Sequence, residues 1–281
     1  MIEEVLVTAR SNAKIDPVLD IWHWEIPVYL FLGGLTAGIM FFAAWVILTR
    51  RDEQAPYAAM KLALWAPIVL SIGMGALFLD LEHKLYVWRF YTTFQTSSPM
   101  SWGSWILLII YPIAILQILS TLRQGYPMLA DLLARIPFGT WAMDFSEKHR
   151  TGIARAAIPF AVSLAIYTGI LLSAFSARPF WNTGILGPLF LISGLSSAAA
   201  LAILISRAPS EKHLFTRIDV GLILVELMLI ALLVINLTTG TEFHLRAADH
   251  ILGGNYTVVF WVYFVGLGLL IPLLLEFREM R

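Results

Sequence analysis

The sequence contains no cysteine and few charged residues. Without cysteine the chain cannot ligate an iron–sulfur cluster, use a thiol nucleophile or form a disulfide. Only 14% of its 281 residues are charged, 59% are hydrophobic, and the formal net charge is zero. The balanced charge gives no indication of nucleic acid binding or of a polybasic membrane anchor. A soluble domain of this length needs more charge to cover its surface, so the composition predicts a polytopic membrane protein.

Histidine is missing from every long apolar run. The six histidines all lie outside those runs: His23, His83, His149, His213, His244 and His250. A transmembrane b-type haem takes its axial ligands from helices at membrane depth, commonly paired histidines, so a cytochrome b is disfavoured. No two histidines have convincing ligand spacing for zinc. We therefore expect no haem and no other metal site in this chain.

The apolar residues form seven runs, each close to the roughly 20 residues that a spanning helix needs. The predicted spans are Ile26–Thr49, Ala58–Leu79, Ser101–Leu122, Ile153–Phe175, Gly184–Ser206, Ile218–Thr238 and Thr257–Leu275. Runs of this length fit helices better than barrel strands, because in hydrocarbon the backbone must satisfy its own hydrogen bonds. The first 20 residues lack the basic-then-apolar order of a cleaved signal peptide, and we interpret them as a short tail. We expect an all-α transmembrane helix bundle, a single domain over residues 1–281.

Lysine and arginine are unevenly divided between the two sides of this bundle. Thirteen lie on the side of Arg50 and Arg217, whereas six, including Arg10, Lys14 and Lys84, lie on the other. Cytoplasmic loops carry the excess of basic residues, so the N-terminus is predicted outside and the C-terminus inside. Residues 80–99 and 239–255 then share the outer face with the entry to the first span.

Two local patterns concern packing. Gly34 and Gly38 form a GxxxG motif in the first span, which lets helix backbones approach closely but is common in any helical bundle. In the long connection from Arg123 to Arg150, apolar residues recur at helical spacing: Leu129, Leu132, Leu133 and Ile136. This spacing predicts a short interfacial helix, which we interpret as a structural cover.

Aromatic and protonatable residues gather at the predicted outer edge. The members of this group precede the first span or follow the second: Trp22, His23, Trp24, Glu25, Asp80, His83, Arg89 and Trp102. One interpretation is an aromatic belt with charges in the headgroup layer. The other is a pocket for a lipid-soluble quinone between aromatic side chains, with donors for its carbonyl groups. Histidine titrates near neutrality and burial raises a carboxyl pKa towards it, so such a pocket would also hold acceptors for two protons.

Two members of the outer edge have a specific helical position. Glu25 and Tyr29 are four residues apart and project from the same face of the first helix. Asp80 ends the second span, where a carboxylate is either a hydrogen-bonded helix-end residue or, with His83 close behind, a catalytic one.

Two acidic residues lie in the sixth span. Asp219 is near its cytoplasmic end and Glu226 lies deeper, seven residues away on the same face, at roughly 10 Å. A carboxylate at membrane depth is costly, and its default interpretation is function. The alternative is a protonated Glu226 that is hydrogen-bonded to a neighbouring helix.

Several stretches resemble the NrfD/polysulfide-reductase family of integral membrane quinone-binding subunits. They are "WHWEIPVYLFLGGLTAG", "LDLEHKLYVWRFYTTFQTSSPMSWGSW", "YTGILLSAFSARPFWNTGILGPLFLISGLSSAAA", "VELMLIALL" and "FWVYFVGLGLLIPLLLE". They occur in family order across almost the whole chain, which is more specific than any one stretch. The family pattern generally has eight spans and this sequence has seven, which leaves the packing of the last helix open.

The resemblance implies a subunit that binds menaquinone or ubiquinone near the outer face and holds no haem or cluster itself. It implies a ferredoxin-like iron–sulfur subunit on the outer face, a molybdopterin or multihaem catalytic subunit, and a bacterial or archaeal cytoplasmic (inner) membrane. The expected catalytic residues are His23, Glu25, Asp80 and His83. The expected quinone-binding residues are His23, Trp24, Tyr29, Arg89 and Trp102. Asp219 and Glu226 are the candidates for a proton relay.

Two other classes of function remain open. A proton- or solute-translocating module without a redox role would use Glu226 as its site, although paired broken helices, which favour that class, are not evident. A purely structural anchor for a peripheral complex would need none of these residues. In the redox interpretation the chain completes an oxidoreductase without being an enzyme alone.

Overall fold

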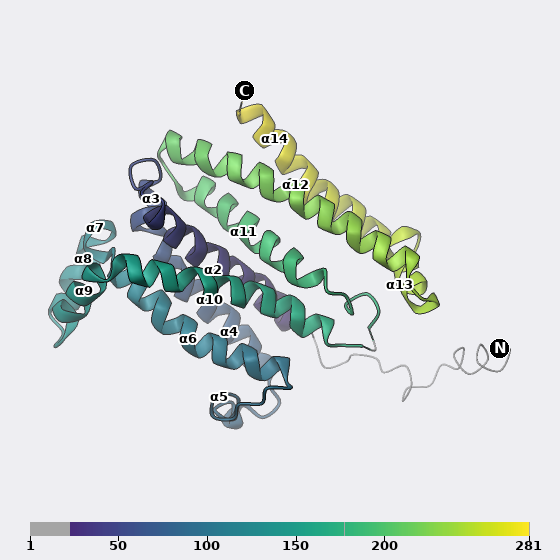
Figure 1. Cartoon of the computed structure of the whole chain (residues 1–281), viewed down its shortest axis with the longest axis horizontal. Helices are drawn as coiled ribbons and strands as arrows, with labels where there is room; N and C mark the ends of the chain where they lie inside the picture. Colours follow the sequence, from purple (N-terminus) through teal and green to yellow (C-terminus); the bar gives the residue numbers. More distant parts are fainter. Residues whose placement is uncertain (1–22, 177, 281) are drawn as a thin grey trace.

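The computed structural model describes residues 23–176 and 178–280, and every regular element in them is a helix (Figure 1). Arg10, Lys14, Trp22 and the rest of the predicted tail lie outside these residues. Within them, seven helices are long and apolar enough to cross a membrane. They are α2 (Glu25–Leu48), α4 with its leading turn η1 (Trp65–Asp80 and Leu62–Leu64), α6 (Pro99–Leu119), α10 (Arg150–Ser173), α11 (Leu186–Ile205), α12 (Pro209–Thr239), and η3 with α14 (Val259–Leu270 and Ile271–Glu279). The predicted all-α membrane fold is confirmed.

Short helices connect the spans. They are α3 (Pro56–Met60), η2 (Lys84–Tyr86), α5 (Arg89–Thr92), α7 (Leu122–Gly125), α8 (Pro127–Ala134), α9 (Gly139–Lys148) and α13 (Glu242–Leu252). The single interfacial helix expected between Arg123 and Arg150 is instead a pair, α8 and α9. α5 and α13 lie at one end of the bundle and α3, α8 and α9 at the other (Figure 1). We label these ends outer and cytoplasmic after the topology predicted from the sequence, which stays a prediction.

All seven spans begin at residues other than those that the apolar pattern predicts, and the second and the sixth differ most. The second begins at Leu62 rather than Ala58, because the proline-initiated α3 forms a separate helix that ends before Lys61. The sixth begins at Pro209 rather than Ile218, since α12 continues beyond the apolar run. Hydropathy identifies only the apolar part of a helix. The helix itself can continue into polar sequence, as α12 does between Pro209 and Ile218.

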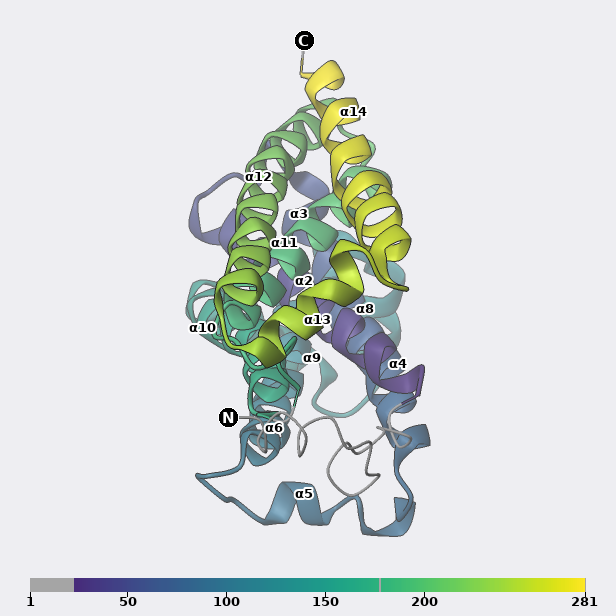
Figure 2. The same ribbon diagram turned by 90° about the vertical axis from the view of Figure 1, so that its right-hand side faces the viewer.

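The helix α2 is the centre of the bundle. It packs against α4, α10 and α11, and 67% of its most apolar window is buried, against 17% for the seventh span. With α4, α6 and α10 it forms a four-helix group, while α11, α12 and the seventh span lie on the other side (Figure 1). α13 crosses the outer end of α12 and leads into the seventh span (Figure 2). The first five spans therefore enclose most of the core, and the last is peripheral.

Glycine allows α2 and α11 to touch through their backbones. A Cβ atom at Gly38 would overlap the carbonyl oxygen of Gly194 and the side chain of Ala198, and a Cβ at Gly194 would lie 2.6 Å from the carbonyl oxygen of Gly34. Lipid supplies no hydrophobic drive between helices, so such close contact supplies packing energy instead. The GxxxG motif thus serves the contact of α2 with α11.

We predict that Gly38→Val separates this helix pair, because the added side chain has no space between the two backbones. The expected loss is roughly 2 kcal/mol or more of folding free energy. The thermal midpoint of the purified protein in detergent measures it. Gly33→Ala is the matched control, since a Cβ there meets nothing within 4 Å. Equal midpoints for the two variants would contradict the contact.

A fully buried carboxylate joins the cytoplasmic end of α12 to α3. The Glu211 side chain accepts hydrogen bonds from the backbone N–H groups of Tyr57 (3.1 Å) and Ala58 (2.7 Å), and from the hydroxyl of Ser206 (2.6 Å). These amides belong to the first turn of α3 and have no partner within that helix. A negative charge there also complements the positive end of the helix dipole. Glu211 is therefore a structural residue that holds the loop after α2 against α12.

We predict that Glu211→Ala lowers the free energy of unfolding by about 3 kcal/mol, because it leaves two buried amides without acceptors. Chemical or thermal denaturation in detergent measures the change. Lys212→Ala, at the exposed neighbouring position, is the control. A Glu211→Ala protein as stable as that control would remove the proposed role.

Candidate functional site

A cavity of about 490 Å³ lies between α2, α4, α6 and α10 at the outer end of the bundle. We call it the four-helix cavity. Its walls are mostly apolar, and its polar groups come from different helices: Tyr29, Asp80, Tyr91, Ser104 and Tyr167. A largely apolar cavity with a few convergent polar groups is the usual form of a small-molecule site.

Tyr29 and Tyr167 direct two phenols to this cavity from opposite helices. Tyr29 is 4% exposed and Tyr167 is 5% exposed, and neither hydroxyl has a hydrogen-bond partner among the described residues. Buried phenols usually find a partner, so two unpaired ones at one cavity are available to a bound molecule. Tyr29, one of the predicted quinone-binding residues, lines this cavity, and its role in binding stays a prediction.

Tyr167 reaches its position because residue 103 is glycine. A Cβ atom at Gly103 would overlap the ring and hydroxyl of Tyr167, so the phenol lies directly over the backbone of α6. The sequence analysis did not select Tyr167 or Gly103 as site residues. A tyrosine inside an apolar span was a signal that could have identified Tyr167. Sequence reasoning also missed Tyr91 of α5, whose phenol has a raised pKa because of burial, with a smaller contribution from Tyr111. Tyr91 therefore stays protonated and can donate a hydrogen bond.

A second, more open cavity of about 590 Å³ adjoins the first on the outer side. His83 and Arg89 line it, and Asp80 lines both cavities. The Arg89 guanidinium lies over the ring of Tyr86 at 4.7 Å, and the His83 ring meets the same tyrosine edge-on at 6.4 Å. Asp80 thus stands where the buried cavity meets the outer loop.

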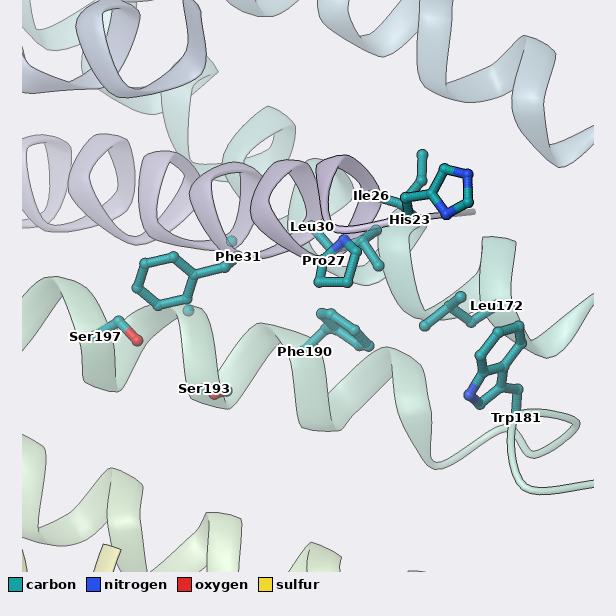
Figure 3. Close-up of a pocket in the computed structure, with 12 residues that line it drawn as sticks. His23, Ile26, Pro27, Leu30, Phe31, Leu172, Trp181, Phe190, Ser193 and Ser197 are labelled. Carbon is teal, nitrogen blue, oxygen red and sulfur yellow. The ribbon is translucent and has the colours of Figure 1, made fainter. Parts of the chain in front are cut away.

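His23 faces a third cavity, of about 410 Å³, between α2 and α11 (Figure 3). We call it the α2–α11 cavity. His23 lies near the start of α2, Phe190 of α11 lies opposite Pro27, and Phe31 of α2 projects towards Ser193 and Ser197 further along α11 (Figure 3). The two buried cavities share a wall of apolar residues: Ile26, Leu30 and Leu172. His23 and Tyr29 therefore serve neighbouring cavities rather than one.

Three other predicted residues line none of these cavities. Trp24 is 61% exposed beside the start of α2. Trp102 donates its indole N–H to the carbonyl of Thr96 at 2.8 Å and so supports the outer loop. The Oε2 atom of Glu25 is buried without a hydrogen-bond partner among the described residues. Their assignment to the site stays a prediction.

Asp219 and Glu226, the two acidic residues within the apolar part of α12, are buried and face α11. The Ser196 hydroxyl donates to Asp219 at 2.6 Å, and the Glu226 carboxyl lies beside Ser193. Ser193 also lines the α2–α11 cavity, so this cavity extends close to Glu226. The Asp219 carboxyl has a further neighbour that sequence reasoning missed, Glu276 of α14. Glu276 follows the last predicted span by one residue, which is why an apolar pattern did not select it.

Among residues 23–176 and 178–280, no group of three or more histidine or acidic side chains could hold a metal ion. The chain also has no cysteine. The polar groups that line the three cavities include phenols, hydroxyls, carboxyl groups, imidazoles and the Arg89 guanidinium.

Known proteins match the chain over most of its length. The profile of the family described as polysulphide reductase, NrfD, matches residues 11–280. A polysulfide reductase protein of Wolinella succinogenes is 29% identical over 269 residues, which cover 91% of this chain and 83% of that protein. Protein NrfD of Escherichia coli is also 29% identical over 269 residues, covering 91% and 84%. A selenate reductase subunit of Mesobacillus selenatarsenatis is 25% identical over 289 residues, covering 90% and 66%. The resemblance inferred from the sequence is therefore confirmed: this multi-pass membrane chain belongs to the polysulphide reductase NrfD family.

Proposed function

We propose that the chain is the membrane subunit of a respiratory reductase complex and that it binds quinone in the four-helix cavity. The names of the relatives, which include polysulfide, selenate and tetrathionate reductase subunits, support the first part. The observation that carries the second is the apolar cavity with the unpaired phenols of Tyr29 and Tyr167. We further propose that the complex resides in the cytoplasmic membrane of a bacterium or archaeon, with the N-terminus of the chain outside.

The residues of the cavity fit a quinone head group. Its volume lies within the range of about 300–1,000 Å³ that is common for small-molecule sites. Apolar side chains such as Leu107 and Leu171 would pack on the ring and the start of the isoprenoid tail. Tyr29 and Tyr167 would donate to the ring carbonyl oxygens, because a neutral phenol is a donor.

Proton exchange would occur at the outer side. A bound quinone or quinol supplies chemistry of two electrons and two protons. Asp80 would take a proton at the junction of the cavities, and His83 and Arg89 in the adjoining outer cavity would connect it with water. His23 lies across the wall of Ile26, Leu30 and Leu172, where it and Glu25 would exchange a second proton.

Electrons would pass to another subunit, since we expect no redox group within this chain. We propose a ferredoxin-like iron–sulfur subunit on the outer face, in contact with residues 80–99 and α13, and a molybdopterin or multihaem catalytic subunit beyond it. Exposed aromatic side chains on that face support a docking surface there: Tyr86, Trp88, Phe90 and Phe94.

Purification of the native complex tests the class of function. We expect stoichiometric quinone together with iron in the complex. A pure complex without iron and without quinone would contradict the redox function. That result would favour one of the two other classes of function, a translocating module or a structural anchor.

We predict that Tyr167→Phe weakens binding of a quinone analogue to the complex about 3- to 10-fold, because one neutral hydrogen bond is lost. Inhibitor titration of quinone turnover measures the effect, and Tyr29→Phe should act in the same direction. Tyr111→Phe is the matched control, since its phenol pairs with Ser71 at 3.2 Å and does not line the cavity. If both cavity variants bind as tightly as the control, the ring does not bind there.

The buried carboxyls favour an additional role in proton transfer. We propose that Glu226 and Asp219, with Ser193 and Ser196 of α11, relay protons between the cytoplasmic end and the quinone site. The relay would make quinone turnover generate a membrane potential. The competing interpretation is that Glu226 is a hydrogen-bonding structural residue.

Reconstitution of the complex in liposomes separates these interpretations. We predict that Glu226→Gln abolishes most of the membrane potential at a given rate of turnover, because an amide cannot release a proton. Glu279→Gln, which changes an exposed carboxylate at the end of α14, is the control. Unchanged turnover and unchanged potential in Glu226→Gln would assign this residue to structure alone.

A further inference from the structure

The cytoplasmic connection between α6 and α10 exposes an apolar surface that no described residue covers. It is formed by α8, α9 and the turn between them, and we call it the hairpin patch. Its members are large apolar side chains with exposed fractions from 41% to 85%: Met128, Leu129, Leu132, Ile136, Phe138, Trp141 and Phe145. Exposed apolar surface of this extent on neighbouring elements usually indicates a binding surface.

The helix α9 carries its aromatic and its acidic side chains on different sides. Trp141 stacks on Phe145 at 5.6 Å, and Phe145 lies over the His149 ring at 4.4 Å, which makes an aromatic stripe at helical spacing. On another side of the helix, Asp144 and Glu147 form ion pairs with Arg123 at 2.7 and 2.9 Å. The helix α9 therefore has three sides: one packs on the bundle, one carries the exposed aromatic stripe, and one carries the ion-paired carboxylates.

The helix α8 also exposes an apolar side. Met128 and Leu132 are exposed one turn apart, and the exposed Asp131 lies about 100° around the helix from Leu132, at the edge of this apolar side. Ala130 is the buried residue that faces the rest of the protein. The apolar sides of α8 and α9 both remain uncovered by the described part of the chain.

The turn between the two helices holds Phe138 in an unfavourable conformation. Its φ is 68°, in the left-handed region that bulky side chains avoid, and its side chain is 81% exposed. A glycine or asparagine would relieve the backbone there, and it would remove little contact within the chain because the Phe138 side chain is mostly exposed. A phenylalanine at this point is explained if its ring is buried in something outside the chain.

The position of the hairpin identifies what covers it. It follows α6 after the short helix α7 and leads directly into α10, and it lies across the cytoplasmic ends of these two membrane spans (Figure 1). The exposed apolar side chains of α6, such as Ile115, continue the apolar surface towards it. Arg135 and Lys148 flank the patch, and both are exposed. Basic side chains at these positions can contact lipid phosphates.

We propose that the α8–α9 hairpin inserts into the cytoplasmic leaflet, with the hairpin patch at the boundary between headgroups and acyl chains. Phe138 is the deepest residue, and the ion-paired face of Asp144 and Glu147 points to water. Amphipathic helices with aromatic and basic residues bind membranes in this way, without spanning them. The connection is thus a monotopic anchor within a polytopic protein.

The absence of cysteine allows a direct test in the full chain. Single substitutions Met128→Cys, Leu132→Cys and Phe138→Cys introduce a site for an environment-sensitive fluorophore on the patch. Thr140→Cys, on the side of α9 that carries Asp144 and Glu147, is the matched control, and Asp131→Cys marks the polar edge of α8. Each labelled protein is placed in nanodiscs that contain spin-labelled lipid, and quenching by this lipid is compared with quenching by aqueous iodide.

We expect lipid quenching at the three patch positions to exceed that at the control by about threefold, with the opposite order for iodide. Strong iodide quenching at the patch would overturn the proposal, because the surface would then face water. Protection from both quenchers within the native complex, lost in the isolated chain, would overturn it as well, because a partner protein would then cover the patch. Three patch positions keep the test decisive if one variant fails to fold.

Discussion

The contact of α2 with its neighbours is the constraint on which the rest of the arrangement depends. In a bilayer the backbone must satisfy its own hydrogen bonds, so the chain forms helices, and the helices hold together where small residues let them meet. Gly34 and Gly38 place α2 against α11 on one side, while α4 and α10 pack on the other. Both buried cavities at the outer end use α2 as a wall. The same helix therefore sets the fold and separates the two candidate spaces.

Because the two cavities are separate, the proposed binding of the quinone ring and the proposed proton path use different spaces. The four-helix cavity supplies apolar walls and phenols, which suit a ring that must bind and leave. The α2–α11 cavity supplies His23 at its mouth and Ser193 near the buried Glu226. Ring binding and a path for protons would thus occupy adjacent spaces with a thin apolar wall between them. Asp80 and His83 offer the shorter exchange route to the outer side.

Sequence periodicity predicts the helical fold well because lipid selects for apolar runs of nearly fixed length. The grouping at the outer edge and the family resemblance select Tyr29, Asp80 and His83 as candidates, and these residues line the two adjoining cavities, although their roles stay predictions. Periodicity does not predict which helices are neighbours. Tyr167 becomes a cavity residue only because Gly103 of another helix leaves space for its ring, and Glu276 joins Asp219 only through the packing of α14 on α12. Glu211 looks like an ordinary polar residue before a span until its backbone partners on α3 are known.

The central claim is that the quinone ring binds between α2, α4, α6 and α10. Photolabelling of the native complex with a photoreactive quinone, followed by peptide mapping, tests it most directly. We predict label on segments that line the four-helix cavity, around Tyr29, Gly103 and Tyr167, and competition of this label by excess unmodified quinone. Label confined to segments outside that cavity, such as Ser193–Ser197 of α11, would contradict it.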